Sequence, residues 1–355
     1  MNTIELTSAN FQELILAWFD RHGRKDLPWQ QAITPYRVWI SETMLQQTQV
    51  ATVVPYFNAF ITTFPTVEQL AAAPIDQVLQ HWSGLGYYAR ARNLHKTAQK
   101  IAELGQFPNS LTELIALPGI GQSTAGAILS IAFKNSHPIL DGNVKRVLTR
   151  FKAIPGWPGE NRVNKMLWTI SADLTPANRV ADYTQAMMDL GATVCKRSQP
   201  KCAICPLVDY CLAHLTNSVS DYPAPKPRKS LPVKTRVFLL LKSNQEILLE
   251  KRPPAGIWGG LWSVPEFDSI DDALYWSKTK NINIIKQQTL PTQRHTFSHF
   301  HLDYTALVAT VKNPANNVME GNQSVWYKSE QANSLGIATP IKRLLQQLTH
   351  EDNND

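Results

Sequence analysis

Through the first part of the chain, apolar side chains recur every three or four residues, which is the spacing of amphipathic helices. Residues 8–22 predict an opening helix on this basis. A second helix is predicted to begin at Pro35, with Thr34 as its cap, and to continue through the polar run 46–49. Further helices are predicted over residues 111–117, 125–133 and 161–194.

The pattern changes to that of strands after a proline-rich, basic stretch at residues 222–232, which is typical of an extended linker. Residues 236–241 and 246–251 predict a β-hairpin around 243–245. Further on, apolar and polar residues alternate from 299 to 304, as in a strand with one buried face. We therefore expect a helical domain over 1–216, a linker over 217–235 and an α+β domain over 236–350.

Length and composition agree with this division. A chain of 355 residues is long enough for two domains, and 43% hydrophobic with 18% charged residues is typical of a globular protein. The net charge of +7 favours a polyanionic partner. No signal peptide and no apolar run of membrane-spanning length are visible. We expect a cytoplasmic protein with no membrane partner.

All four cysteines fall in one short segment, with the spacing C-x6-C-x2-C-x5-C: Cys195, Cys202, Cys205 and Cys211. Such clustering argues against a disulfide framework, which would join distant segments, and predicts a metal centre in a reducing compartment. Ligand chemistry alone leaves zinc and a [4Fe–4S] cluster both open. Lys196 and Arg197 lie on the loop between the first two ligands, where binding of the metal would stiffen a basic contact for phosphate.

The segment Pro118–Gly126 predicts a hairpin between two helices, because Gly119 and Gly121 permit a tight turn. Unpaired N–H groups at the start of the second helix would suit a phosphate, although a neutral turn is an equally simple interpretation. Downstream, Asp141 precedes a basic helix at 144–150. Its carboxylate is a candidate functional group, a helix N-cap, or both.

Glu42 is the unusual residue of the second helix, because it shares a face with the apolar Val38 and Leu45. A carboxyl in apolar surroundings has a raised pKa, as a general acid at neutral pH requires. The alternative is a glutamate at the rim of the core, paired with an arginine.

Residues 82–94 join a glycine turn, two adjacent tyrosines and two arginines. A stacking aromatic ring beside guanidinium groups is suited to wedging a duplex open. The alternative is a core tyrosine with solvated arginines, and we expect at least one of the two tyrosines to be buried.

These motifs resemble the helix-hairpin-helix DNA glycosylase superfamily, whose signature is LPGxG with a downstream aspartate. The run Ser41–Gln49 is similar to that of MutY-type adenine DNA glycosylases, and the resemblance covers residues 8–345. It implies a multidomain fold: an all-α helix-hairpin-helix glycosylase domain with an iron–sulfur cluster loop, followed by an α+β Nudix-like domain. It also implies one [4Fe–4S] cluster on the four cysteines, and a monomer associated with the nucleoid.

The resemblance assigns roles to individual residues. Glu42 would protonate the adenine and Asp141 would stabilise the oxocarbenium ion. The substrate would be double-stranded DNA with adenine opposite 8-oxoguanine or guanine; no protein partner is indicated. The expected DNA and substrate contacts are Leu27, Trp29, Gln46, Gln47, Thr48, Leu85, Tyr87, Gly119, Gly121, Ser123, Asn143, Gln185, Lys196, Arg197, Phe297, Ser298 and His299.

The sequence departs from related enzymes at two places, and each departure limits the activity that we expect. Ser123 stands where relatives resembling endonuclease III carry a lysine that forms a Schiff base, so we expect base release without efficient strand cleavage. Residues 268–274 lack the REUxEE helix of Nudix hydrolases, so we expect a Nudix-like scaffold without pyrophosphatase activity. The alternatives are a glycosylase with lyase activity or another mismatch substrate, a non-catalytic iron–sulfur DNA-binding protein, and a nucleotide hydrolase.

Overall fold

The computed structural model describes residues 6–227, 230–244, 246–254, 256–312, 324–328 and 335–352, with 349–352 as backbone only. The chain forms two compact units. One comprises Met1–Ala72 and Asn93–Arg228, and the other Ala73–Arg92 and Lys229–Asp355. The division at residue 228 falls inside the segment 217–235, whereas the grouping of residues 73–92 with the C-terminal unit has no counterpart in the sequence pattern.

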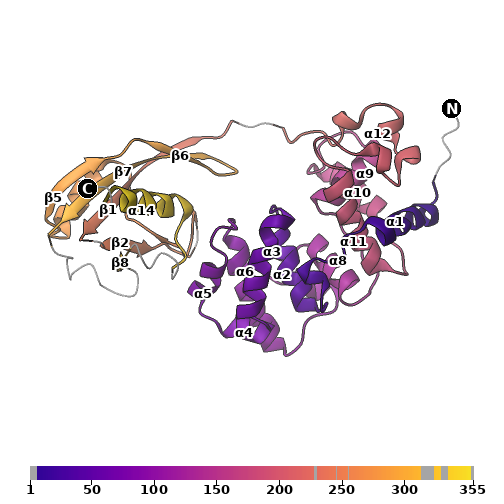
Figure 1. Cartoon of the computed structure of the whole chain (residues 1–355), viewed down its shortest axis with the longest axis horizontal. Coiled ribbons are helices and arrows are strands. Elements are labelled where there is room, and N and C mark those ends of the chain that lie inside the picture. The colour runs from indigo at the N-terminus through magenta and orange to yellow at the C-terminus, as the bar shows by residue number, and fades with distance from the viewer. Residues whose placement is uncertain are drawn as a thin grey trace. The chain divides into compact units, whose positions relative to one another are not determined.

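The described elements of the first unit are all helical (Figure 1). They are α1 Ser8–His22, η1 Pro28–Gln30, α2 Pro35–Leu45, α3 Val50–Thr63, α4 Val67–Ala72, α6 Ala89–Leu104 (its first turn lies in the other unit), α7 Leu111–Ile115, α8 Gln122–Ile131, α9 Gly142–Phe151, α10 Asn161–Leu174, α11 Val180–Asp189, η2 Leu190–Val194, η3 Cys202–Ile204, η4 Val208–Tyr210, α12 Leu212–Leu215 and η5 Val219–Asp221. None of the described helices has the length and apolar character needed to cross a bilayer.

The predicted starts of these helices follow from local capping. Thr34 accepts a hydrogen bond from the Arg37 amide and caps α2, with Pro35 in the first turn. The prediction that α2 continues through residues 46–49 is wrong, because α2 ends at Leu45 and α3 begins at Val50. Gln47 adopts a left-handed backbone (φ +58°), and the Thr48 amide bonds to the Leu45 carbonyl, which closes the helix.

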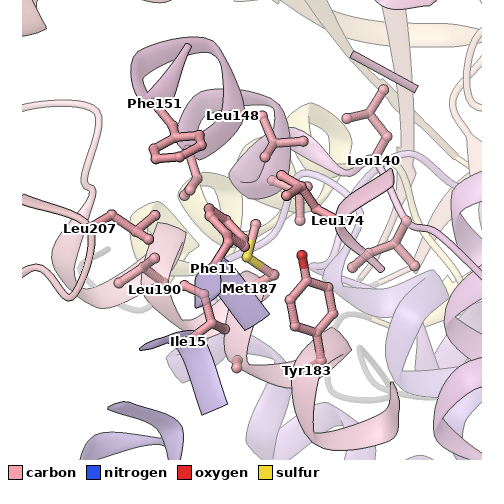
Figure 2. Packing of buried hydrophobic residues seen from close by; sticks show 14 of the residues in the cluster. Phe11, Ile15, Leu140, Leu148, Phe151, Leu174, Tyr183, Met187, Leu190 and Leu207 are labelled. Carbon is pink, nitrogen blue, oxygen red and sulfur yellow. The ribbon is translucent and has the colours of Figure 1, made fainter. Parts of the chain in front are cut away.

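A hydrophobic core joins α1, α9, α10 and α11, and Figure 2 shows its side chains pointing toward one another. Phe11 of α1 packs on Phe151 of α9 with ring centroids 4.9 Å apart, and Leu174 and Met187 close the cluster. This core fixes α9 relative to α11. The functional side chains at the ends of those helices are therefore held by buried apolar surface.

The second unit contains α5 Ile75–His81 and a mixed sheet. Its strands are β1 Val233–Ser243, β2 Glu246–Lys251, β3 Trp262–Ser263, β4 Glu266–Phe267, β5 Ile284–Thr289, β6 Gln293–Thr296, β7 His301–Val311 and β8 Ser324–Lys328, with helices α13 Ile270–Thr279 and α14 Thr339–Asp352. The central pair β1 and β7 is parallel, and the order is β3-β2-β1-β7-β5.

The hairpin and the alternating strand of this unit match the sequence predictions. β1 and β2 are antiparallel, with Ser243 opposite Glu246. Along β7, Leu302 and Tyr304 are buried, as is Phe300 just before it. Ala273 of α13 packs with β1 and β7 on one side of the sheet, and Gln347 of α14 bonds to Gln293 of β6. The observed architecture is thus a helical N-terminal domain and an α+β C-terminal domain.

Candidate active site and metal centre

The predicted hairpin lies between α7 and α8. Gly119 has φ +80°, and a Cβ there would lie 2.8 Å from Asn93 Cβ, so only glycine fits. Gly121 is the N-cap residue of α8, and no side chain accepts a hydrogen bond from the amides at this end of the helix. The first N–H groups of α8 therefore face outward from an exposed turn, a geometry that suits an anion.

Asp141 caps the next helix, α9. Its Oδ1 accepts a hydrogen bond from the Val144 amide at 2.7 Å, and its Oδ2 accepts one from Asn143 Nδ2 at 3.2 Å. Arg146 in turn donates to Asn143 Oδ1 at 2.8 Å and to the Cys195 carbonyl at 2.6 Å. Asp141 therefore acts as the N-cap of α9. Its carboxylate is oriented by a series of hydrogen bonds that reaches the loop carrying the cysteines.

Glu42 and Asp141 line the same cavity, which has a volume of about 800 Å³. Burial and, to a smaller extent, the negative charge of Asp141 raise the pKa of Glu42 to about 8. Burial also raises the pKa of Asp141, but the hydrogen bonds from Val144 and Asn143 and the charge of Arg146 oppose that rise. Because these hydrogen bonds and the Arg146 charge favour the ionised form of Asp141, Glu42 is the carboxyl group that holds a proton at neutral pH.

Eight of the seventeen predicted DNA and substrate contacts line this cavity. Besides the two carboxyl groups, the lining includes Leu27, Trp29, Gln46, Gln47, Thr48, Ser123, Asn143 and Gln185. Ser123 Oγ accepts a hydrogen bond from the Leu140 amide at 3.0 Å, which ties the start of α8 to the residue before Asp141. Side chains separated by more than 150 residues in sequence thus form one site.

Part of the cavity lining depends on Asp189, a fully buried carboxylate at the end of α11. Arg24 donates to it from its backbone N (2.8 Å), Nε (3.0 Å) and Nη2 (2.6 Å). Gln185 Nε2 also donates to Asp189, at 3.0 Å. Asp189 therefore fixes both the loop that carries Leu27 and Trp29 and the amide of Gln185, which lines the cavity.

The four cysteines gather around a second, much smaller cavity of about 30 Å³, which Arg150 and Leu207 also line. Burial raises the pKa of Cys205 to about 12, so without a metal this thiol is neutral at pH 7. Within the described part of the chain, no group of three or more His, Cys, Asp or Glu side chains is arranged so that it could hold a metal ion.

Buried Arg150 faces the thiols from α9. It donates to Cys195 Sγ at 3.4 Å, to the Lys196 carbonyl at 2.7 Å and to the Tyr222 carbonyl at 2.8 Å. Lys196 and Arg197 remain exposed on the same loop. Four soft sulfur ligands facing a buried cation fit an anionic thiolate-bound metal centre.

The predicted contacts of the C-terminal unit lie in two loops. Tyr87 is 52% exposed, whereas its neighbours Tyr88 and Leu85 are buried, so one of the two tyrosines belongs to the core as expected. Phe297, Ser298 and His299 form the turn between β6 and β7, which the Phe297 amide closes by bonding to the Phe300 carbonyl at 2.9 Å. Both Ser298 and His299 are exposed.

Comparison with known proteins identifies the family. Residues 40–172 match the model of the HhH-GPD superfamily base excision DNA repair protein, and residues 236–347 match that of the NUDIX domain. The adenine DNA glycosylase of Buchnera aphidicola subsp. Acyrthosiphon pisum is 40% identical over 96% of this chain and 98% of its own length. The chain belongs to the adenine DNA glycosylase family.

The chain is also similar to a second member of the adenine DNA glycosylase family and to one solved structure. The human adenine DNA glycosylase is 32% identical over 94% of this chain and 73% of its own length. A thermostable thymine-DNA glycosylase superposes with a TM-score of 0.54 at 25% identity, over 59% of this chain and 97% of that structure. The first family model begins in α2 and ends in α10, so it spans both Glu42 and Asp141.

In this member of the adenine DNA glycosylase family, sequence reasoning missed Arg24, Asp189, Arg146 and Arg150. One signal was present: Asp189 follows the apolar pair Met187 and Met188 on a helix, and a buried charge requires a partner. The identity of that partner, 165 positions away, could not be read from spacing.

Proposed function

We propose that this chain is a base-excision repair glycosylase that hydrolyses the N-glycosidic bond of adenine paired with 8-oxoguanine or guanine in duplex DNA. The observation that carries the proposal is the pair Glu42 and Asp141 in one cavity, with the pKa of Glu42 raised to about 8. The adenine DNA glycosylases that match the chain over nearly its whole length support the choice of base.

The chemistry requires that adenine leave deoxyribose as a neutral base. Glu42 donates its proton to N7 of the extruded adenine while the C1′–N9 bond breaks and its electron pair moves to the base. The ionised Asp141 stabilises the oxocarbenium ion that remains. Water then bonds to C1′, and the Glu42 carboxylate takes up the proton that the water loses.

The surrounding residues receive supporting roles. Leu27, Trp29 and Gln185 line the adenine pocket, and Gln47 and Tyr87 each help to hold open the gap left in the duplex. Gln46, Thr48 and Asn143 contact the nucleotide near the cavity, and Ser123 supplies no amine for a Schiff base. The hairpin at Gly119 and Gly121, with Lys196 and Arg197, binds phosphates.

Selection between 8-oxoguanine and guanine is assigned to the turn Phe297–His299. Adenine is an undamaged base, so discrimination must come from the opposite strand. The exposed Ser298 and His299 offer hydrogen-bonding groups at a fixed turn. Because a good pair of base-edge contacts is worth about 1–3 kcal/mol, Ser298→Ala should lower the preference for 8-oxoguanine by roughly tenfold.

The four cysteines are proposed to hold one [4Fe–4S] cluster, which would supply a structural crosslink for the basic loop. Anaerobically purified protein should contain iron and sulfide in equal amounts, and Cys202→Ser should lose both together with affinity for DNA. One zinc ion per chain with no sulfide would contradict this assignment.

The decisive assay measures adenine release from duplexes with adenine opposite 8-oxoguanine, guanine or thymine. Release from the first two, with no strand cleavage until alkali is added, is the expected result. Strand cleavage without alkali would instead indicate a glycosylase with lyase activity, and removal of thymine would indicate a different mismatch substrate.

A further inference from the structure

Segment 73–92 is attached to the loop 256–260 within the C-terminal unit. Arg92 Nη1 donates a hydrogen bond to the Gly259 carbonyl at 2.5 Å. A second, separate link joins Asp76 Oδ2 to Lys251 Nζ at 2.7 Å. The segment that carries Tyr87 is thus fixed to the Nudix-like domain at two points.

The turn that presents Tyr87 is itself rigid. Arg90 Nη2 donates to the carbonyls of Leu85 (3.1 Å) and Gly86 (3.2 Å), and Trp82 Nε1 also donates to Gly86, at 3.1 Å. The Arg90 guanidinium lies 5.5 Å from the centre of the exposed Tyr87 ring. Since Arg92 is two residues further along α6, a displacement of Arg92 is transmitted to Tyr87.

Loop 256–260 has a tightly specified shape. Gly256, Trp258 and Gly260 all have left-handed backbones, with φ of +88°, +52° and +75°. A Cβ at Gly259 would lie 2.6 Å from the Pro254 carbonyl oxygen. Hydrogen bonds hold this conformation: the Gly260 amide donates to the Pro253 carbonyl at 3.0 Å, and Arg252 Nε donates to the Ile257 carbonyl at 3.0 Å.

The other side of this loop supports the turn Phe297–His299. The Trp258 ring lies 5.3 Å from that of Phe297 and 5.7 Å from that of His295. Phe297 also stacks on the buried Phe300, with centroids 4.6 Å apart and an interplanar angle of 20°. Trp258 and Phe300 therefore both pack on Phe297, the residue before the exposed Ser298.

We propose that loop 256–260 is a fixed spacer between Tyr87 and Ser298, and that Arg92 and Trp258 are positioning residues for discrimination of the base opposite adenine. The inference rests on the proposed function. One unbroken series of contacts runs from the Tyr87 turn through Arg92, Gly259 and Trp258 to Phe297. Two contacts held at one fixed spacing bind more selectively than two that move independently.

The test compares single-turnover rates of adenine release opposite 8-oxoguanine and opposite guanine. Arg92→Ala and Trp258→Ala should lower the rate opposite 8-oxoguanine about tenfold more than the rate opposite guanine. Trp258→Phe keeps a ring against Phe297 and should restore most of the preference. The matched control is Asp76→Ala, which breaks the other link of the same segment; because Lys251 lies on β2 and not in loop 256–260, this variant should leave the preference unchanged.

A double variant separates coupling from two independent effects. Arg92→Ala combined with Phe297→Ala should lose little more preference than Phe297→Ala alone, whereas multiplied losses would overturn the spacer. The spacer would also be overturned by an Asp76→Ala variant that loses as much preference as Arg92→Ala, or by equal losses on both duplexes in Arg92→Ala. A wild-type protein that releases adenine equally from both duplexes would overturn the inference but not the proposed function, whereas a protein that releases adenine from neither duplex would refute both.

Discussion

Replacing Glu42 with glutamine should reduce adenine release by roughly 10²–10⁴-fold, because the amide cannot donate the proton that the departing base requires. The side chain keeps its size in the half-buried site, so affinity for a duplex with adenine opposite 8-oxoguanine should be retained. Single-turnover kinetics and a binding titration measure the two effects separately. Ordinary turnover by this variant would remove Glu42 from the mechanism.

Two controls exclude trivial causes for the loss. Glu160→Gln removes an equal charge from an exposed side chain of the same unit and should leave the rate unchanged. The second control is thermal stability as a function of pH. Folding raises the pKa of Glu42 from 4.5 to about 8, so its contribution to stability is fully present below pH 4.5 and is lost as pH rises through 8.

The amide of Glu42→Gln does not ionise, so this variant does not lose stability between pH 4.5 and 8. The variant should therefore melt a few degrees higher than wild type at pH 8 and at about the same temperature near pH 4, since about 1 kcal/mol shifts Tm by roughly 2–4 °C in a domain of this size. A variant that is less stable at pH 8 would show that its inactivity reflects folding.

Asp141→Asn should have the second largest effect, a loss of roughly 10²–10³-fold in base release. Asparagine is as good an N-cap as aspartate, so α9 should keep its hydrogen bond from the Val144 amide and the melting temperature should change little. The variant removes the negative charge that faces the developing sugar cation, together with the oxygen that accepts a hydrogen bond from Asn143 Nδ2.

Asp141→Ala is the matched comparison, because it removes both the charge and the cap. It should lose as much activity as Asp141→Asn and about 1 kcal/mol of stability besides. If Asp141→Asn retains wild-type rates while Asp141→Ala does not, Asp141 acts through helix capping alone.

Local signals made the main elements of the site predictable. The start of α2 follows from Thr34 and Pro35, and the start of α9 follows from the capping preference of Asp141. The apolar neighbours of Glu42 along α2 correctly indicated a raised pKa. Burial along a helix and capping of its end depend on residues three or four positions apart, so both can be predicted from the sequence.

Features that depend on distant segments could not be predicted in this way. The end of α2 is set by the left-handed Gln47, and polar residues with acceptable helix propensity gave no sign of it. Arg24, the partner of Asp189, lies on the loop that follows α1. The hydrogen bond from Arg92 to Gly259 likewise joins residues 167 positions apart. Such contacts depend on tertiary packing, and the periodicity of apolar residues in the sequence does not predict them.

The pH dependence of single-turnover adenine release tests the paired roles of Glu42 and Asp141 most directly. Because Glu42 holds its proton up to about pH 8, the wild-type rate should fall about tenfold per pH unit above that value, and this decline should be absent in Glu42→Gln. At the acidic end the rate should fall as Asp141 is protonated. A wild-type rate that stays constant or rises above pH 8 would contradict the account.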